Sequence, residues 1–354
     1  MNLITEPRLA LLLMALLSGL PFSAREIAAQ DASLTGRVVD ADTGNPLPGV
    51  NLFLDQTTRG AASTDDGTYE ISGLHPGSYR VVASAVGYGI ESILLEVVPA
   101  RGQYTSHFRL KSVVVELEGF EVGGERPRGW KKNLQRFEKG FLGSSANARM
   151  TEILNPYVLD FETADGRFSA RASTPLTIEN RALGYRLIAV LSYYYDTGRR
   201  ITMGGPVSFY ELEPSDSAEA ARWRENREIA YRGSFMHLMR SLVQGNSRQQ
   251  GFFVAHEIPR GAYGYGKKRR VDVGLIPFIG AGDHPYQYRL DFEHLLYVEY
   301  GRETSWLRLT VDEATLHEDG YLYSSDYDDP PMSVSGDMSN RRVADMLPRD
   351  YQAH

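Results

Sequence analysis

Apolar and polar residues alternate with a period of two along several short runs near the start of the chain, which is the pattern of half-buried β-strands. Turn residues separate these runs about every 8–12 residues, as they do in a β-sandwich. The runs are Ser33–Asp40, Val50–Asp55, Gly60–Asp65, Thr68–Ile71, Tyr79–Ala85, Glu91–Val98 and His107–Ser112. The pattern therefore predicts a β-sandwich over residues 31–116.

Two of the separating segments have clear turn chemistry. Asp65–Gly67 combines aspartates, which can accept hydrogen bonds from the local backbone, with a glycine that tolerates positive φ. His75–Gly77 places proline and glycine where a type II turn needs them. These turns predict that the strands on either side are connected by tight reversals.

The pattern changes after the sandwich. Residues 117–129 mix glycine, proline and charges and predict a linker. Apolar residues at helical spacing then predict a helix near residues 130–142, and alternation over 185–195 predicts a long strand. A second helix is expected near 217–243, because serine and acidic residues precede its apolar stripe. Residues 130–354 are therefore expected to form a second, mainly β domain with about two helices.

The N-terminal residues have the pattern of a secretory signal peptide. Arg8 precedes an apolar run from Leu9 to Phe22, and small residues follow at Ala28 and Ala29. About 14 apolar residues are fewer than the roughly 20 that span a bilayer. We therefore expect residues 1–29 to be a signal peptide, with an uncleaved anchor as the alternative. The mature protein is then exported to the periplasm, outer membrane or cell surface, without a transmembrane helix.

Composition narrows the class of partner. The chain has 354 residues, which suggests two domains, and its formal net charge is −7. An acidic chain has no general attraction for nucleic acid, so we expect none as a partner; peripheral membrane association stays open. There is no cysteine, which excludes disulfides and the acceptor thiol of a lipoprotein anchor.

The first predicted domain resembles a known family. The runs GRVVDADTGNPLPGVNLFL and GAASTDDGTYEISGLHPGSYRVVASAVGY, with their order of glycines, prolines and a final Gly-Tyr, look like the carboxypeptidase-regulatory-like domain. That family has a transthyretin-like sandwich of the immunoglobulin-like type. It occurs beside metallocarboxypeptidases and at the front of Bacteroidetes outer-membrane receptors. The resemblance implies an accessory module that scaffolds or interacts, and not a catalyst.

The rest of the chain is similar to the C-terminal region of secreted proteins of the Bacteroidetes type that carry the same sandwich. The similar segments are FLGSSANARMTEILNPYVLDF, IENRALGY, AYRGSFMHLMRSL and RVADMLPRDY. This second resemblance implies no activity and no ligand residues.

The common catalytic and metal-binding motifs do not occur. No H-x-x-E, H-E-x-x-H or G-x-S-x-G is present, and the adjacent pairs at 256–257 and 317–318 lie in or near strand patterns, where neighbours face opposite ways. The acidic runs at Asp40 and Asp326–Asp329 do not fit a calcium loop and are expected to be turns. We expect no metal, cofactor or catalytic residue, although a distant carboxylate pair stays open.

The segment Gly261–Arg270 is the main candidate for a binding surface. GAYGYGKK begins like a phosphate-binding loop, but Lys268 replaces the required serine or threonine, and strand-like residues follow. Its basic and aromatic residues could instead contact lipopolysaccharide, anionic lipid or a protein, or could form a solvated charge run. The candidate residues are Tyr263, Tyr265, Lys267, Lys268, Arg269 and Arg270. Tyr194, in the run Tyr193–Tyr195, is a further candidate for stacking on sugar or filling an interface, with core packing as the alternative.

Taken as a sequence, the chain is best interpreted as a non-enzymatic cell-envelope protein. Its sandwich would act as an accessory or interaction module for an outer-membrane or periplasmic partner, either a protein or a glycan. The alternative is a secreted hydrolase acting on peptide or glycan, with its site in the C-terminal domain. A carboxylate pair or a serine–histidine pair within one cleft would favour this alternative.

Overall fold

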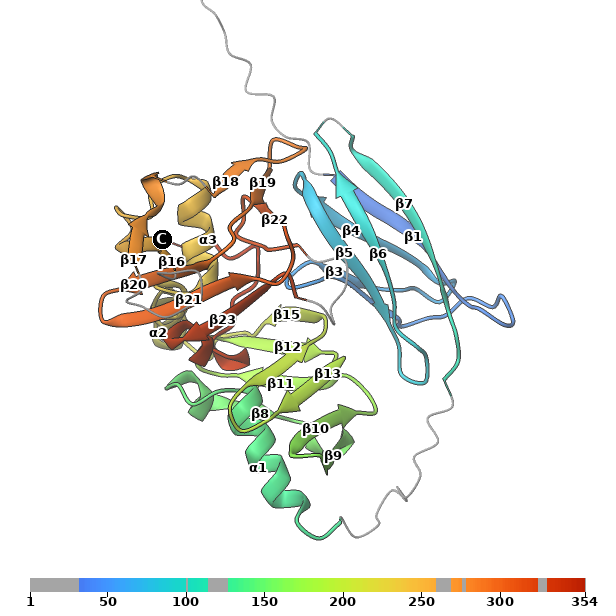
Figure 1. The fold of residues 1–354 in the computed structure, drawn as a ribbon. Coiled ribbons are helices and arrows are strands. Elements are labelled where there is room, and N and C mark those ends of the chain that lie inside the picture. The colour runs from blue at the N-terminus through green and yellow to red at the C-terminus, as the bar shows by residue number, and fades with distance from the viewer. Residues whose placement is uncertain are drawn as a thin grey trace, which may run out of the picture. The chain divides into compact units, whose positions relative to one another are not determined.

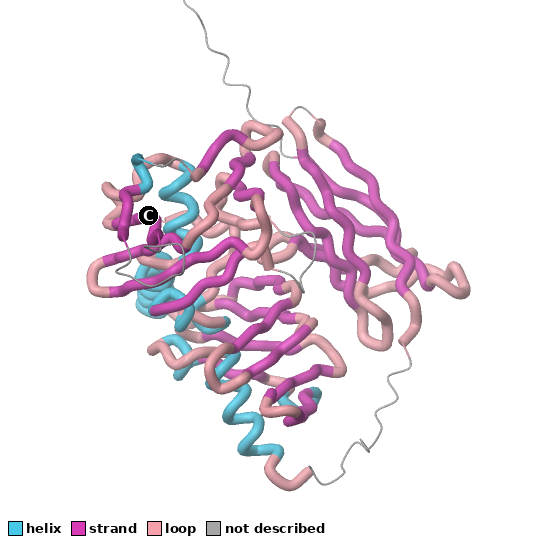
Figure 2. Tube along the Cα trace, in the orientation of Figure 1, coloured by secondary structure: helices cyan, strands magenta, loops and turns pink. Residues whose placement is uncertain are grey.

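Strands dominate the computed structural model of the protein, and the α-helices of the described residues all lie after residue 129 (Figures 1 and 2). The structure describes residues 32–99, 101–113, 127–258, 269–275, 278–323 and 330–353. The expected signal peptide and most of the expected linker lie outside these residues, so both stay predictions. The expectation of a mainly β chain that begins with a β-sandwich is confirmed.

Among the described residues, seven strands form the sandwich. They are β1 Ala32–Asp40, β2 Asn51–Leu54, β3 Gly60–Ala62, β4 Thr68–Leu74, β5 Gly77–Ser84, β6 Glu91–Val97 and β7 Gln103–Leu110. One sheet has the order β4-β1-β7 and the other the order β3-β2-β5-β6. β1 runs antiparallel to β4 and parallel to β7.

Alternating residues of both sheets fill the sandwich core. Leu34 and Val38 of β1 pack in one cluster with Val81 of β5 and Phe108 of β7, and all four are fully buried. Gly36 lies between two of them on β1, and a Cβ there would stand 1.6 Å from the carbonyl oxygen of Ser106. Glycine is therefore required at this position because the neighbouring strand approaches too closely for any side chain.

The turn expected at Asp65–Gly67 is confirmed. The Asp66 carboxylate accepts hydrogen bonds from the backbone N–H of Thr68, at 3.3 Å, and from its hydroxyl, at 2.8 Å. A hydrogen bond from the Thr64 hydroxyl, together with these two from Thr68, lowers the pKa of Asp66 to about 2. Gly67 has φ +76°, which the tight reversal into β4 requires.

The next eight strands form two four-stranded sheets. They are β8 Thr151–Ile153, β9 Leu159–Ala164, β10 Arg167–Ala172, β11 Leu176–Asn180, β12 Tyr185–Ala189, β13 Tyr193–Asp196, β14 Ile201–Gly204 and β15 Val207–Glu211. Their orders are β15-β12-β11-β8 and β14-β13-β10-β9. Helix α1, Trp130–Phe141, joins their core through Phe137 and Phe141, so the helix expected near 130–142 is confirmed.

The long strand expected over 185–195 is two strands in different sheets. Three residues separate β12 from β13, and within them the N–H of Val190 donates to the carbonyl of Pro206 while the N–H of Ser192 donates to that of Gly204. The backbone therefore stays paired while the chain passes from one sheet to the other. Alternation alone cannot reveal such a transfer, because both strands keep the same period.

The remaining elements are helices α2 Ser217–Tyr231 and α3 Phe235–Val243, with strands β16 Phe252–Ile258, β17 Arg269–Asp272, β18 Ile279–Ala281, β19 Gln287–Leu290, β20 Leu295–Tyr300, β21 Glu303–Leu309, β22 Ala314–His317 and β23 Met332–Gly336. Their sheets have the orders β17-β16-β20-β21-β23 and β18-β19-β22. Short 3₁₀ helices are η1 Asn147–Met150, η2 Pro156–Val158, η3 Val273–Leu275, η4 Asp337–Asn340 and η5 Val343–Asp345.

The single helix expected over 217–243 is divided into α2 and α3. Gly233 has φ +71° and ends the helical path after α2. Ser234 then caps α3, because its hydroxyl accepts a hydrogen bond from the N–H of His237 at 3.1 Å. A glycine followed by serine is both a stop and a start signal, so the sequence contains the reason for the break.

Residues 31–354 form one compact unit, within which a sandwich loop pairs with a strand of the C-terminal part. The N–H of Gln56 donates to the carbonyl of Val207 at 2.7 Å, and the N–H of Phe209 donates to the carbonyl of Thr57 at 3.0 Å. The carboxylate of Asp55 accepts from the N–H of Val207 at 2.9 Å. The loop after β2 therefore covers the otherwise free edge of β15.

Candidate functional site

Most of the predicted basic and aromatic loop is not described. Tyr263, Tyr265, Lys267 and Lys268 lie outside the described residues, and Arg269 is described only as the first residue of β17. The guanidinium carbon of Arg270 lies 3.4 Å from the ring centre of Tyr297, and its Nε lies 3.7 Å from a carboxylate oxygen of Glu257. Arg270 is thus held on the sheet, and the binding role of the loop stays a prediction.

Tyr194 is wrong as a surface candidate, because its side chain is completely buried. Its ring meets those of Phe137 and Phe168 edge-on, with centres 4.8 and 6.2 Å away. Burial raises the pKa of Tyr194 to about 12. Of the tyrosine run, Tyr195 is exposed and stacks on Tyr193 with ring centres 6.1 Å apart.

No group of three or more metal-ligating side chains occurs among the described residues. Asp40 acts as the expected turn residue, because one of its oxygens accepts bonds from the N–H groups of Asp42 and Thr43 and from the Thr43 hydroxyl. The acidic run at 326–329 lies outside the described residues. Within the described part of the chain, no helix is long and apolar enough to cross a membrane.

The C-terminal segment joins the sandwich through buried Arg349. The Nε and one Nη of Arg349 donate to the same oxygen of Asp319, at 2.9 and 2.6 Å. Its other Nη donates to the carbonyl of Ser78 on β5 at 3.3 Å, and its backbone N–H donates to the carbonyl of Gln56 at 2.6 Å. The guanidinium also lies 4.0 Å from the ring centre of Tyr321. One residue therefore connects the sandwich, the turn after β22 and the chain end.

Arg240 of α3 holds the same segment from the other side. Its three donor nitrogens bond to the carbonyl oxygens of Asp319, Arg349 and Tyr351 at 2.7, 2.8 and 2.9 Å. Arg240 is itself buried, so carbonyl oxygens replace the water around its charge. Each of its three nitrogens donates to a backbone carbonyl, which indicates a structural role.

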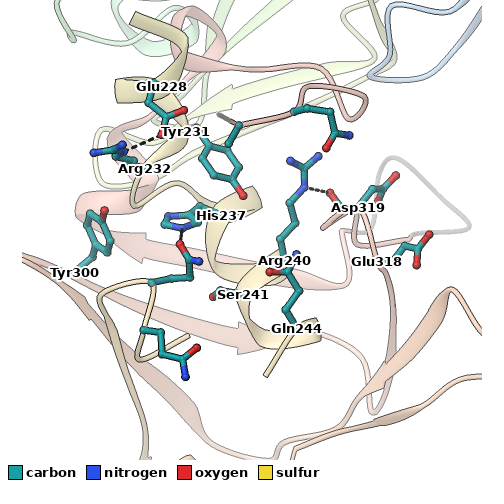
Figure 3. A pocket seen from close by; sticks show the side chains of 14 residues that line it. Glu228, Tyr231, Arg232, His237, Arg240, Ser241, Gln244, Tyr300, Glu318 and Asp319 are labelled. Carbon is teal, nitrogen blue, oxygen red and sulfur yellow. Dashed lines mark hydrogen bonds and ion pairs between the residues drawn. The ribbon is translucent and has the colours of Figure 1, made fainter. Parts of the chain in front are cut away.

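A polar pocket of about 660 Å³ opens beside α3 (Figure 3). Its wall includes Glu228, His237, Ser241, Tyr300 and Glu318. Tyr231 and Tyr300 lie against the imidazole of His237, with ring centres 4.7 and 5.8 Å away (Figure 3). The pocket thus combines aromatic rings, amides and carboxylates, which are the groups that proteins use to hold polar ligands.

The hydrogen bonds of His237 decide what this pocket can do. Its Nδ1 accepts a bond from the N–H of Gly233 at 3.1 Å, so Nε2 carries the proton and donates to the side-chain oxygen of Gln250 at 3.1 Å. Burial lowers the pKa of His237. Ser241 donates to the carbonyl of Leu238 at 2.7 Å instead of to the imidazole. Histidine and serine share the pocket without forming a nucleophile–base pair.

Sequence reasoning did not single out Arg240 or Arg349. Both lie within segments that carry the resemblance to secreted proteins, but a lone arginine gives no signal of what it will contact. Their partners are backbone carbonyls and one carboxylate from distant parts of the chain. Of the residues near this pocket, only Ser234, which caps α3, and the preceding Gly233 have a structural role that the sequence can predict.

Residues 33–111 match the family model of the Carboxypeptidase regulatory-like domain. The resemblance inferred from the sequence is therefore confirmed for this segment. No curated protein matches the chain.

Several solved structures have a distant likeness to the chain. A DUF3823 family protein from Bacteroides ovatus is 15% identical, with 52% of this chain and 82% of that chain covered and a TM-score of 0.20. A candidate carbohydrate binding protein from Bacteroides uniformis is 11% identical, with coverages of 51% and 99% and a TM-score of 0.20. The backbone protein of group B streptococcus pilus 2b is 16% identical, and the chain spans 42% of its length, with 24% of this chain covered and a TM-score of 0.21. These values describe only a distant likeness to β-sandwich proteins.

Proposed function

We propose that the protein is a non-enzymatic component of the cell envelope, exported to the periplasm or the outer membrane. Its carboxypeptidase regulatory-like sandwich would support the C-terminal part, and the two would engage an envelope protein or glycan together. The observation that carries this proposal is the use of Arg349, which bonds to Asp319 and to Ser78 and so joins the sandwich to the chain end.

The hydrogen bonds between the sandwich and β15 favour a structural role for the sandwich. Its loop at 55–57 makes main-chain hydrogen bonds with β15, as a neighbouring strand would. A module that is only tethered to a catalytic domain has no need of such pairing. The sandwich contributes instead to the stability of the C-terminal part, whose remaining surface is free to contact a partner.

The chemistry of the His237 pocket supports binding over catalysis. Both imidazole nitrogens are engaged by Gly233 and Gln250, and the Ser241 hydroxyl is engaged by a carbonyl oxygen. A general base needs a free lone pair close to the proton that it removes. Neither His237 nor Ser241 offers one here, whereas Glu318 at the pocket wall can accept hydrogen bonds from a ligand.

The proposal is tested by mild crosslinking and pull-down of the tagged mature protein from its own cell envelope. We expect a protein or glycan of the envelope to be captured and to be displaced by excess untagged protein. Captured material that excess untagged protein does not displace would be bound non-specifically and would not support the proposal. If nothing is displaced and the purified protein cleaves a peptide or glycoside substrate, the hydrolase alternative replaces this proposal.

Export is tested separately. N-terminal sequencing of the protein recovered from fractionated cells should show a chain that starts near residue 30, in the periplasmic or outer-membrane fraction. A full-length chain in the inner membrane would indicate the uncleaved anchor, and a full-length chain in the cytoplasm would contradict export.

A further inference from the structure

A second hollow, away from His237, is lined by positive charge. It has a volume of about 990 Å³ and is here called the cationic hollow. Its basic lining residues are Arg136, Lys139, Arg199, Arg200, Arg308 and Arg342. Asp196 is the single acidic residue among the described residues that line it, so six cations and one anion leave a local charge of 6 − 1 = +5. The whole chain has the opposite sign, at −7.

Among the described residues, carboxylates neutralise little of the positive charge in the hollow. Asp196 forms an ion pair with Nε of Arg136 at 2.8 Å, and its other oxygen accepts a bond from the N–H of Gly198 at 2.6 Å. Within the described part of the chain, the other five basic residues of the hollow have no carboxylate within ion-pairing distance. Clustered cations repel one another, so their convergence lowers stability unless an anion binds.

The cations come from segments that are far apart in the sequence. Arg136 and Lys139 lie on α1 three residues apart, which places them on one face of the helix. Arg199 and Arg200 occupy the turn between β13 and β14, and Arg308 lies on β21. Arg342 precedes η5. A surface charge run would come from one segment, whereas here the fold brings together basic residues from four separate segments.

Two glycines at the end of α1 shape one wall of the hollow. A Cβ on Gly140 would stand 2.0 Å from the hydroxyl of Tyr194, and a Cβ on Gly143 would stand 3.0 Å from the Cβ of Arg342. Burial lowers the pKa of the half-buried Arg342, whose charge has no acidic partner among the described residues. The Tyr194 hydroxyl is also buried without a hydrogen-bond partner there. One unsatisfied hydroxyl and one cation without an acidic partner among the described residues therefore lie beside the same wall.

The hollow adjoins the described end of the predicted basic loop. Trp306 lines the hollow and lies on the same side of β21 as Arg308, two residues along the strand. The rings of Trp306 and Tyr297 are 5.8 Å apart, and Arg270 lies over Tyr297. A row of side chains thus leads from β17 towards the hollow. It includes the buried carboxylate of Glu257, which accepts a bond from Nε1 of Trp306 at 3.3 Å and lies 3.7 Å from Nε of Arg270.

We propose that the cationic hollow binds a compact polyanion, namely a saccharide that carries two or more phosphate groups. Arginine forks match phosphate oxygens in pairs, and the five cations that have no carboxylate partner among the described residues exceed the charge of one phosphate. A flat indole beside these cations can stack on a sugar ring. At about 990 Å³, the hollow has the volume of a small-ligand site.

The inference goes beyond the proposed function and is tested independently of any partner, by calorimetry on the purified mature protein. The probe is a disaccharide with two phosphate monoesters, and the same disaccharide without phosphate is its control. We expect saturable binding of the first alone, with an affinity that falls as salt rises from about 50 to 200 mM. Absence of binding to the phosphorylated probe at low salt would overturn the inference.

Matched variants locate the site. Arg308→Gln removes an exposed cation of the hollow, and Arg342→Gln removes the half-buried one; each should weaken binding about tenfold or more. Arg302→Gln makes the same charge change in the β20–β21 turn, outside the hollow, and should change affinity less than about twofold. Thermal melts check folding. An unchanged affinity in folded Arg308→Gln and Arg342→Gln would place the ligand elsewhere.

Three further probes identify the ligand class and its source. The phosphorylated disaccharide acylated in vesicles, compared with the free form, distinguishes a lipid headgroup from a soluble saccharide; binding of either supports the inference. Vesicles of phosphatidylglycerol and a single-stranded oligonucleotide carry phosphate without this saccharide. If either binds as tightly as the disaccharide, the saccharide assignment is wrong.

Discussion

Two guanidinium nitrogens of Arg349 donate to the same carboxylate oxygen of Asp319, at 2.9 and 2.6 Å. Only 4% of the Arg349 side chain is exposed, compared with 29% of the Asp319 side chain. A buried guanidinium is costly unless all its donors find acceptors. Here the remaining Nη finds the carbonyl of Ser78 on the sandwich, so the ion pair is also the joint between the sandwich and the chain end.

Replacing Arg349 with methionine should destabilise the protein by about 3 kcal/mol. Methionine keeps much of the apolar stem but leaves Asp319 and the Ser78 carbonyl without their donor. The loss in the free energy of unfolding should lie near the lower end of the range for a broken buried ion pair, because water can reach Asp319. Urea unfolding of the full chain, followed by circular dichroism, measures it.

Arg59→Met is the matched control at the same joint. Arg59 is 45% exposed and lies 3.8 Å from Asp350, so its loss should cost less than about 1 kcal/mol. Equal losses in the two variants would contradict the special role of Arg349.

Gly233 and Gly245 offer a second matched pair, because each follows a helix and has positive φ, +71° and +66°. Alanine at Gly245 would meet nothing within 4 Å and should cost about 1 kcal/mol for its backbone conformation alone. Alanine at Gly233 would stand 2.6 Å from the ring of Tyr300, so its cost should exceed that of Gly245→Ala by at least about 1 kcal/mol. Chemical unfolding of both variants gives the difference, and a difference near zero would show that Tyr300 moves aside freely.

The sequence predicted what depends on local periodicity. Alternation identified the sandwich strands, and helical spacing with a serine-containing acidic start identified α1 and α2, because these are properties of neighbouring residues. The glycine and serine at 233–234 signal the break, but the apolar stripe of α3 continues the helical spacing of α2 and hides it. The transfer between β12 and β13 was not readable, since strand pairing depends on Gly204 and Pro206, which follow later in the chain.

Tyr194 shows why the candidate site was harder to predict than the fold. Three consecutive tyrosines place aromatic rings on both faces of β13, and identical residues give no sign of which face is the core. The cationic hollow is equally hard to predict from the sequence, and it involves more residues. Its arginines are unremarkable in the sequence and become a site only because α1, β21 and the β13–β14 turn converge.

Tyr194→Phe tests the consequence of that burial. The Tyr194 hydroxyl is buried without a hydrogen-bond partner among the described residues, while its ring packs against Phe137 and Phe168. Phenylalanine keeps the ring and removes the unsatisfied group, so stability should stay unchanged or rise by up to about 1 kcal/mol. Tyr185→Phe, at another buried tyrosine, provides a comparison in the same thermal-melt assay. A loss above about 1 kcal/mol in Tyr194→Phe would mean that the hydroxyl has a partner.

His317 makes stability depend on pH. The side chain is 2% exposed and packs against Tyr286 and Tyr321, with ring centres 6.2 and 6.3 Å away. Burial, with the nearby charge of Arg349, lowers its pKa from 6.5 to about 4. Between these two values the unfolded chain binds a proton that the folded protein does not, so the free energy of unfolding falls as pH falls from about 6.5 to 4. A shift of this size corresponds to a total loss of about 3 kcal/mol.

His317→Phe should remove most of this pH dependence, because phenylalanine keeps an aromatic ring beside Tyr286 and cannot bind a proton. The Nε2 of His317 has no partner among the described residues, so the variant loses no hydrogen bond there. Its unfolding free energy should match that of the wild type near pH 7 and exceed it increasingly towards pH 4.5. Burial lowers the pKa of His237 as well, which leaves a smaller slope in the variant. Replacing exposed His107 in the same way should leave the wild-type slope intact, and equal slopes in His317→Phe and wild type would show that His317 is not the group responsible.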